Sequence, residues 1–408
     1  MIFAEENNRV IPTEDKVFSL SGRAKAAIRK KGKDAVINAT IGALLDDDGE
    51  LVIMSSVAEA ISSLSPEDYA EYAPIAGTPA FQEAVKRALF GKLMPSGHVR
   101  VCATPGGTGS ITSVIANYSK RGEAVLTHDW CWANYKSICS EHGRKMETFR
   151  FFDDEGNFND GDLKKRINEL AAVQDQIVLM LNTPAHNPTG YSMTLDDWDK
   201  VINILNDAPC RTVLFIDVAY IDYAGEDEEV RAFIPKLEKL KDTVLPIFGY
   251  SASKTLTAYG MRCGTIVCMA KEEEVAEEFK RVTGFSARAT WSNGNRSVQV
   301  VMGKIFSDPK MLEKATKERR GYRDMLLERG RTFERVLREN GVECVPFDAG
   351  FFATIACDDP AWLGAELEKQ DIYCVSLAKG IRVSIASISK EKCIRCAEAI
   401  AKLLNPQQ

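Results

Sequence analysis

The stretch Ser251-Ala-Ser-Lys-Thr-Leu-Thr-Ala-Tyr-Gly-Met-Arg262 comes just after the apolar run Val244-Leu-Pro-Ile-Phe248. It sets Lys254 behind two serines and eight residues ahead of an arginine. A lysine at the end of a buried strand can lose its proton and attack an aldehyde, and nearby hydroxyls with an arginine can hold a phosphate. Pyridoxal phosphate carries both groups, so the stretch predicts a site for that cofactor. Standing alone, the same residues would suit a surface lysine in a Ser/Thr loop.

Further motifs precede and follow this lysine. Thr183-Pro-Ala-His186 leads into Asn187-Pro-Thr-Gly190, and Phe215-Ile-Asp-Val-Ala-Tyr220 comes next. The order His-Asn-Pro-Thr-Gly, Asp-x-Ala-Tyr and Ser-x-Ser-Lys resembles the class I aminotransferases, which are fold type I enzymes using pyridoxal phosphate, and among them the aspartate and aromatic branch. Collinear matches make chance improbable. They are Asn38-Ala-Thr-Ile-Gly-Ala43, Tyr72-Ala-Pro-Ile-Ala-Gly77, Gly106-Gly-Thr-Gly109, Trp130-Cys-Trp-Ala-Asn134, Ala287-Arg-Ala-Thr-Trp-Ser-Asn293 and Arg382-Val-Ser384.

The composition is that of a globular chain. Its 408 residues allow two or three domains, and 45% apolar residues suffice for a large core. The formal net charge of −6, with no basic stripe, argues against nucleic-acid partners. No window approaches eighteen uninterrupted apolar residues, and the N-terminus lacks a basic stretch followed by an apolar one. We therefore expect a cytoplasmic protein with no membrane partner.

The cysteines and histidines predict no metal site. Eleven cysteines at irregular spacing fit reduced thiols better than a disulfide framework. Cys393-Ile-Arg-Cys396 has the spacing of a metal or redox pair, but it lies in residues 390–404, where apolar positions recur at helical spacing. We expect a core-facing terminal helix there. The four histidines, at positions 98, 128, 142 and 186, are scattered.

Alternating patterns predict an α/β fold. Apolar runs at residues 99–103, 124–127, 146–151, 177–181, 212–216, 244–248 and 265–269 are typical of strands. Helical patterns separate most of them, one spaced from Phe81 to Leu89 and one opened by the capping-box pair Thr194 and Asp197. Such alternation predicts a mostly parallel sheet covered by helices on both faces. Ligands bind beyond the carboxyl ends of such strands, where the motif residues fall.

The pattern of apolar and charged residues changes near residue 309. A long charged helical stretch, 310–340, is followed by runs at 344–347, 351–356 and 381–385 that are typical of strands in a smaller domain. The resemblance implies a large domain with a seven-stranded sheet plus a smaller α/β domain, which the N-terminal segment joins. We expect an N-terminal arm and part of the small domain in 1–50, the large cofactor-binding domain in 51–308 and the small C-terminal domain in 309–408.

A glycine-rich turn is the second candidate contact for a phosphate. Gly106-Gly-Thr-Gly109 follows a predicted strand and opens a helical pattern, so its amides should point at an anion. An ordinary glycine turn is the alternative. The resemblance implies that Gly107, Thr108, Ser251 and Arg262 form the phosphate cup. Gly106 replaces a serine that is frequent in the family, which leaves the backbone donors in place.

Asp217 ends an apolar strand, where an anion is costly to bury unless a cation meets it. A pyridinium nitrogen would do so and would keep the ring able to accept electrons. A helix N-cap or a local salt bridge is the alternative. The resemblance implies that Tyr220 and Asn187 hydrogen-bond the ring oxygen of the cofactor. It also implies that Trp132 stacks on the ring, for which core filling is the alternative.

Substrate recognition requires planar donors for carboxylates, which arginine supplies and lysine does not. The resemblance implies that Arg382 binds the α-carboxylate, although a surface arginine would be unremarkable in its predicted strand. It implies that Arg288 reaches a distal carboxylate across a dimer interface. The branch often has two prolines after Ser-Asn, where this chain has Gly294-Asn295. Further implied contacts, in a homodimer with shared sites, are those of Gly42, Trp132 and Asn187 with the substrate and of Tyr72 with the partner's cofactor.

These inferences predict an aminotransferase with ping-pong kinetics, in which Lys254, Asp217 and Tyr220 are catalytic and Lys254 moves the α proton. We expect aspartate or glutamate as the amino donor, then aromatic amino acids, and a 2-oxo acid such as 2-oxoglutarate as the acceptor. A carbon–sulfur lyase or decarboxylase on the same fold is an alternative, against which Arg288 argues. A non-catalytic cofactor-binding regulator is another, but residues 1–70 show no basic recognition helix.

Overall fold

The computed structural model describes residues 3, 7, 9, 11 and 14–405. The chain divides into two compact units. The first contains Ile53–Thr183 and Met193–Arg319, and the second contains Ile11–Val52, Pro184–Ser192 and Arg320–Gln408. This division differs from the expected one in two places. The segment carrying Asn187 belongs to the second unit, although it follows a strand of the first, and the later boundary falls inside a long helix instead of at residue 309.

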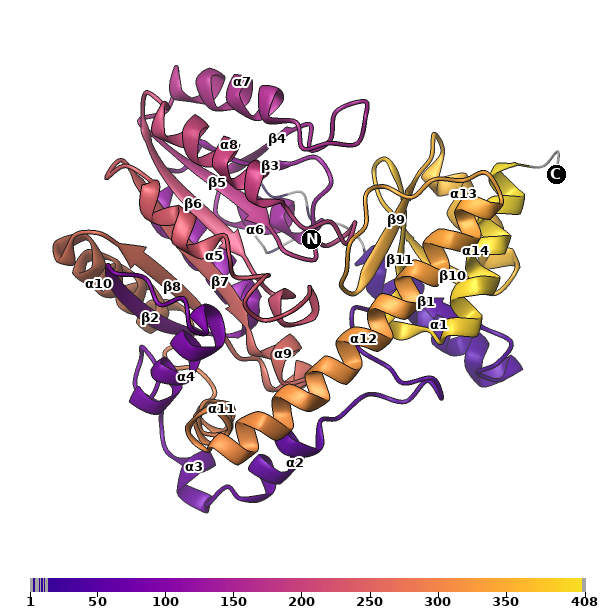
Figure 1. Cartoon of the computed structure of the whole chain (residues 1–408), viewed down its shortest axis with the longest axis horizontal. Coiled ribbons are helices and arrows are strands. Elements are labelled where there is room, and N and C mark those ends of the chain that lie inside the picture. The colour runs from indigo at the N-terminus through magenta and orange to yellow at the C-terminus, as the bar shows by residue number, and fades with distance from the viewer. Residues whose placement is uncertain (1–2, 4–6, 8, 10, 12–13, 406–408) are drawn as a thin grey trace. The chain divides into compact units, whose positions relative to one another are not determined.

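The first unit is built on a seven-stranded sheet (Figure 1). Strand β8 runs antiparallel to both of its neighbours, and the other pairings are parallel. The seven runs predicted as strands all form this sheet, which confirms the mostly parallel arrangement. The strand order is β2 (His98–Thr104), β8 (Gly264–Ala270), β7 (Val244–Ser251), β6 (Arg211–Asp217), β5 (Gln176–Asn182), β3 (Ala124–His128) and β4 (Lys145–Phe149).

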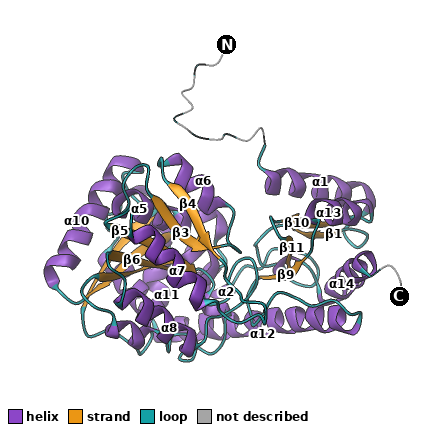
Figure 2. Cartoon of the chain, turned by 90° about the horizontal axis from the view of Figure 1, so that it is seen from above, coloured by secondary structure: helices purple, strands orange, loops and turns teal. Residues whose placement is uncertain are grey.

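Helices enclose the strands of this sheet (Figure 2). Successive strand residues point to opposite faces, so a strand buried on both faces is apolar throughout. In β5, Val178 and Met180 join a core cluster with residues of α5 (Gly106–Tyr118), α6 (Asn134–Glu141) and α10 (Glu273–Thr290). The intervening Ile177 and Leu179 are also buried. Helix α7 (Asp160–Ala171) packs on β4, on β5 and on α8 (Leu195–Asn206).

Both predicted helices of the first unit are present, and a capping box explains where one of them begins. The Thr194 side chain accepts from the Asp197 amide at 3.1 Å, and the Asp197 carboxylate accepts from the Thr194 amide at 2.8 Å, which confirms the capping box of α8. The pattern from Phe81 lies in α4 (Pro79–Phe90), as predicted. The remaining helices of the first unit are α2 (Ser55–Ser62), α3 (Pro66–Ala70), η1 (Ile221–Tyr223), η2 (Ile234–Lys239), α9 (Ala252–Thr255), η3 (Tyr259–Met261) and α11 (Arg296–Ser307).

The second unit contains a four-stranded sheet of order β1 (Ile37–Ala39), β10 (Ile372–Ser376), β11 (Gly380–Ser384) and β9 (Phe352–Ala356). The predicted runs at 351–356 and 381–385 form β9 and β11, and the charged stretch forms α12 (Pro309–Glu339), whose residues from 320 belong to this unit. Strands β1 and β10 were not predicted. The other helices are α1 (Lys16–Lys31), α13 (Pro360–Lys369), η4 (Ile385–Ser387) and α14 (Lys390–Leu404).

The predicted strand at 344–347 is wrong, because this segment forms an irregular loop. Its Val345 amide donates to the Thr354 carbonyl at 2.9 Å, but Pro346 has no amide to continue a ladder. The Phe347 ring fills the space that a Cβ on Gly190 or Gly330 would occupy. The apolar character of this segment reflects the packing of Phe347 against these two glycines and not a place in a sheet.

The prediction of a core-facing terminal helix is confirmed in α14. Cys393 and Cys396 are buried in the core of the second unit, and the thiol sulfurs of Cys396 and Cys374 lie 3.8 Å apart. Burial raises the pKa of the Cys393 thiol to about 12, so this thiol stays neutral at physiological pH. No helix within the described part of the chain is long and apolar enough to span a membrane.

Candidate active site

The carboxyl ends of β6 and β7 bring the predicted catalytic residues of the first unit together. Asp217 is the last residue of β6 and pairs in register with Gly249 of β7. The short helix α9 follows β7 at once and carries Lys254. The Lys254 ammonium nitrogen lies 5.3 Å from the ring centroid of Tyr220 and 4.9 Å from that of Tyr259. The amine is therefore held between two aromatic rings at the sheet edge.

Asp217 is a buried carboxylate with neutral hydrogen-bond donors. The Tyr135 hydroxyl donates to its Oδ2 at 2.7 Å, and the Ala219 amide donates to Oδ1 at 3.2 Å. Burial raises the pKa of Asp217 to about 6, against the lowering effects of these two bonds and of the Lys254 charge. Asp217 forms no ion pair with a described residue, and the N-cap of η1 is Tyr220. The local salt bridge and the N-cap are thus not the roles of Asp217.

The sequence reading missed three residues that support this carboxylate. Tyr135 comes from α6, and burial raises the pKa of its phenol well above the ordinary value, so it remains a donor. The Asn182 side chain donates to the Asp217 carbonyl at 2.8 Å. His128 contacts Asn182 and stacks on Phe151 with ring centroids 4.3 Å apart. Burial lowers the pKa of His128 to about 4, so its ring is neutral.

The first turn of α5 lies against the residues predicted to bind a phosphate. Gly106 has φ +72°, and a Cβ there would lie 2.4 Å from the Arg262 guanidinium. A Cβ on Gly107 would lie 3.5 Å from the Ser251 Cβ. The N-cap of α5 makes no side-chain hydrogen bond, so the capping position leaves its first amides to another acceptor. The positive φ of Gly106 favours glycine, and any side chain at this position would displace the guanidinium of Arg262.

Arg262 is exposed and held at two points. Its Nη1 donates to the Ser253 hydroxyl at 3.3 Å and to the Tyr259 carbonyl at 3.0 Å, and its backbone is left-handed at φ 51°. Together with the α5 terminus and Ser251, this guanidinium forms a cationic cradle of backbone and side-chain donors. The donor set fits a phosphate, and the buried carboxylate of Asp217, which forms no ion pair with a described residue, fits a ring cation.

Two other predicted residues lie near these elements. Thr108 is half-buried in the first turn of α5. Trp132 is half-buried against the core of the first unit and meets the Tyr135 ring edge-on, at 5.8 Å and 82°. Trp132 thus makes core contacts, and its stacking on a cofactor remains a prediction.

In the second unit, Arg382 is buried and fixed by its neighbours. Its Nη1 donates to the Asn187 side-chain oxygen at 3.2 Å, and its Nη2 donates to the Thr40 carbonyl at 2.8 Å. The guanidinium lies 4.4 Å from the Phe352 ring centroid. The same ring approaches Gly42, where a Cβ would lie 2.7 Å from it. Phe352, which the sequence reading missed, is therefore the common neighbour of Arg382 and Gly42.

The turn that carries Asn187 is rigidly supported within the second unit. The His186 Nδ1 and the Thr189 hydroxyl lie 2.8 Å apart. The Thr354 hydroxyl of β9 donates to the Pro188 carbonyl at 2.7 Å. Gly190 has φ +84° with Phe347 and the Phe352 carbonyl against it, so a side chain cannot be accommodated there. The prolyl-threonyl-glycyl motif thus orders the asparagine beside Arg382.

Tyr72 and Arg288, expected to act in a neighbouring subunit, lie on the surface of the first unit. Tyr72 is 85% exposed. Arg288, in the last turn of α10, donates to the Ser292 hydroxyl at 2.5 Å. Of the two residues that replace the expected prolines, Asn295 donates to the Met261 carbonyl at 3.0 Å, beside Arg262. The asparagine that replaces a proline therefore supports the segment that is predicted to bind the phosphate.

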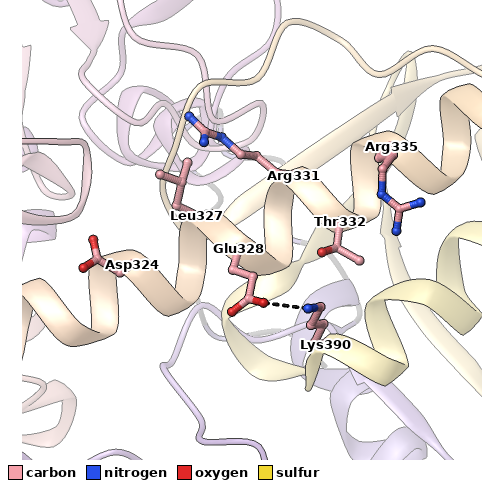
Figure 3. A pocket seen from close by; sticks show the side chains of 7 residues that line it. All are labelled: Asp324, Leu327, Glu328, Arg331, Thr332, Arg335 and Lys390. Atoms are coloured by element: carbon pink, nitrogen blue, oxygen red, sulfur yellow. Dashed lines mark hydrogen bonds and ion pairs between the residues drawn. The ribbon is translucent and has the colours of Figure 1, made fainter.

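A hollow of about 530 Å³ lies along α12 in the second unit (Figure 3). Two of its cations are paired: Lys390 bonds Glu328 at 2.6 Å, and Arg335 bonds Glu339 at 2.8 Å. It contains none of the predicted site residues.

Comparison with known proteins agrees with this chemistry. A family model described as aminotransferase class I and II matches residues 34–400. The aromatic-amino-acid aminotransferase of Paracoccus denitrificans is 30% identical over 281 residues, which cover 68% of this chain and 69% of that protein. The crystal structure of an Anaerococcus prevotii aminotransferase is 35% identical with a TM-score of 0.96, covering 99% of this chain and 100% of the other. A Burkholderia pseudomallei aromatic-amino-acid aminotransferase, solved covalently bound to pyridoxal phosphate, shares the fold at 19% identity and a TM-score of 0.82, covering 98% and 100%.

Proposed function

Because the chain belongs to the family of class I and II aminotransferases, whose members use pyridoxal phosphate, we propose that it transfers the amino group of a dicarboxylic or aromatic amino acid to a 2-oxo acid such as 2-oxoglutarate. The observation that carries the cofactor assignment is the Asp217 carboxylate. It is buried, it receives hydrogen bonds from Tyr135 and Ala219, and it forms no ion pair with a described residue.

The cofactor-binding roles follow from the groups described above. Pyridoxal phosphate supplies an aldehyde that exchanges amines and a ring that accepts electrons. Lys254 would hold the aldehyde carbon, and Asp217 would pair with the ring nitrogen. Tyr220 and Asn187 would bind the ring oxygen, and Trp132 would stack on the ring. The phosphate would be held by Gly107, Thr108, Ser251 and Arg262.

The chain's own residues would perform binding and proton transfer. Arg382 presents a guanidinium whose orientation is fixed by Thr40, Asn187 and Phe352, which suits bidentate binding of the α-carboxylate. Gly42 keeps the Phe352 ring close because it has no side chain. Once displaced by the substrate, the Lys254 amine would take the α proton and return it to another carbon. The aromatic neighbours of its nitrogen, Tyr220 and Tyr259, restrict its position.

Substrate range and assembly complete the proposal. Tyr72 is highly exposed, and Arg288 lies on the surface at the end of α10, positions that support their contribution to the site of a second copy. We therefore propose a homodimer with shared sites, in which Arg288 binds the distal carboxylate of aspartate or glutamate. An arginine fork distinguishes such a substrate from an uncharged one.

A panel of amino acids assayed with 2-oxoglutarate tests the proposal. We expect glutamate to form stoichiometrically with the 2-oxo acid of the donor, most rapidly with aspartate or an aromatic donor. Pyruvate and ammonia released from cysteine-like substrates without an acceptor would instead identify a lyase. Carbon dioxide release would identify a decarboxylase, and spectral binding of the cofactor with no turnover of any donor would identify a non-catalytic protein.

A further inference from the structure

Lys254 lies in a helix that is too short to be stable by its own hydrogen bonds alone. Helix α9 has four residues, Ala252–Thr255, and a single turn fixes many dihedral angles for few hydrogen bonds. The Lys254 carbonyl accepts from the Thr257 amide at 3.1 Å, and from the Tyr223 hydroxyl, also at 3.1 Å. Tyr223 is almost fully buried. Part of the restraint on this turn therefore comes from a tyrosine of another segment.

The next residue, Thr255, is held by a chain of hydroxyl groups. The Tyr250 hydroxyl donates to the Thr255 hydroxyl at 2.6 Å, and the Thr255 hydroxyl donates to Asp222 Oδ2 at 2.6 Å. The Tyr250 hydroxyl also lies 3.4 Å from Asp222 Oδ2. All three residues are buried or nearly so. A hydroxyl that both accepts and donates in this way has a single orientation.

Asp222 is anchored in turn. Arg231 Nη2 pairs with Asp222 Oδ1 at 2.7 Å, and side-chain exposure is 5% for Arg231 and 7% for Asp222. Arg231 also donates to the Ala88 carbonyl at 2.8 Å and to the Leu89 carbonyl at 3.1 Å, in the last turn of α4. The carboxylate is thus tied to the end of a well-packed helix.

Charge keeps this carboxylate ionised. Burial alone raises the pKa of Asp222, but the charges of Arg319 and Arg231 and hydrogen bonds from Thr255 and Arg231 hold it below its ordinary value. Arg319 is itself buried, with its Nη2 donating to the Thr316 hydroxyl at 3.2 Å. A permanently charged acceptor makes the bond from Thr255 a charge-assisted one, which is stronger than a bond between neutral groups.

The short segment 217–223 therefore contains residues of the proposed cofactor site and also residues that contact the helix carrying Lys254. Asp217 and Tyr220 belong to the proposed cofactor site, while Asp222 and Tyr223 of η1 contact α9. We propose that Asp222, acting through Thr255, and Tyr223, acting on the Lys254 carbonyl, are positioning residues for the lysine. The proposal rests on the proposed function for its effect on the rate, but not for its effect on the backbone.

The test is a set of threonine variants. Thr255→Val removes the hydroxyl, and Thr255→Ser restores it. Thr283→Val is the matched control, because the Thr283 hydroxyl is equally buried and donates to the Phe279 carbonyl at 2.7 Å inside α10. Tyr223→Phe is a second test, with Tyr118→Phe as its control, because no described group bonds the buried Tyr118 hydroxyl.

Hydrogen exchange of the holoenzyme, read by mass spectrometry over residues 249–259, reports the backbone. We expect faster exchange there in Thr255→Val and Tyr223→Phe, and wild-type exchange in Thr255→Ser and both controls. We also expect kcat to fall about ten- to a hundredfold with KM little changed, since small misplacements of a reacting group cost rates of that order. Wild-type exchange in both Thr255→Val and Tyr223→Phe would overturn the proposal.

The outcomes also separate the two proposals. An inactive wild-type enzyme whose variants still show the localised exchange would refute the proposed function and retain the positioning network. Active enzyme with unchanged kcat in Thr255→Val and Tyr223→Phe would refute positioning and retain the function. If Thr255→Val proves unstable, the Tyr223→Phe and Tyr118→Phe pair decides, because each removes one oxygen only.

Discussion

Replacing Asp217 with asparagine should change how the stability of the cofactor-free protein depends on pH. The folded-state pKa of Asp217 is raised to about 6 from 3.8, so the folded protein favours the protonated carboxyl. This contribution to stability is fully present below the unfolded-state pKa and is lost as the pH rises through 6. Linkage with these two values gives a loss of about 2 kcal/mol between pH 4.5 and 7.5.

Asparagine keeps an acceptor for Tyr135 and does not titrate, so it should remove this loss. The stability of Asp217→Asn relative to wild type should therefore increase by about 2 kcal/mol from pH 4.5 to 7.5. Urea unfolding of both cofactor-free proteins across this range measures the difference from the midpoints, at equal slopes. His128, whose pKa is lowered to about 4, titrates in both proteins, so its effect cancels.

Addition of cofactor provides the internal control. A ring cation beside Asp217 favours the ionised carboxylate, so cofactor should stabilise the wild type more as the pH rises and should do so less in Asp217→Asn. A stability difference between the two cofactor-free proteins that does not vary with pH would refute the reasoning, because it would mean that burial does not perturb this carboxyl.

Borohydride should discharge the colour of the holoenzyme into a covalent adduct at Lys254, and Lys254→Ala should bind cofactor without turnover; a peptide mass map showing the adduct at another lysine would contradict this. Arg288→Asp should lower kcat/KM for aspartate by roughly a hundredfold more than for phenylalanine, and equal losses would mean a structural arginine. Mixing Lys254→Ala with Arg288→Asp subunits should recover up to about a quarter of wild-type activity toward a dicarboxylate, whereas no recovery after verified exchange would place both residues in one subunit's site. Gly106→Ala should weaken cofactor binding at least about tenfold, because its Cβ would displace Arg262, while Gly122→Ala, at a similar φ with open space around it, should not; equal affinities of the two variants would show that the cradle does not hold the phosphate.

The parts of the site that sequence could predict are those fixed by local order along the chain. Lys254 and Asp217 follow apolar strands directly, so their place at the carboxyl edge of a parallel sheet follows from topology. Tyr135 could not be found in this way, since its contact with Asp217 depends on how α6 packs against β4 and α5. The sequence around Tyr135, five residues after Trp130, contains no pattern that would indicate its role.

The same distinction holds for the fold. Inner strands of the large sheet such as β5 and β6 are almost wholly buried and mostly apolar, which made them visible, whereas β1 has three residues and gave no pattern. The apolar run at 344–347 gave a false signal because Phe347 packs against glycines and not in a sheet. Asn187 was expected in the large domain because it follows β5 closely in the sequence. Adjacency in the sequence, however, does not decide which core a loop joins.

The pairing of β1 with β10 sets an order of events during synthesis. Ile37 lies opposite Ile372 in this parallel pair, so the first strand leaves the ribosome 335 residues, 372 less 37, before its neighbour. At ordinary elongation rates that interval is about 20 to 70 seconds, far longer than a hairpin needs to form. Throughout it the edge of β1 is unpaired, and strand edges of this kind invite wrong partners. The sheet of the second unit can therefore be completed only after β10 has been synthesised, and a chaperone that shields residues 37–39 during this interval should raise the yield of folded protein.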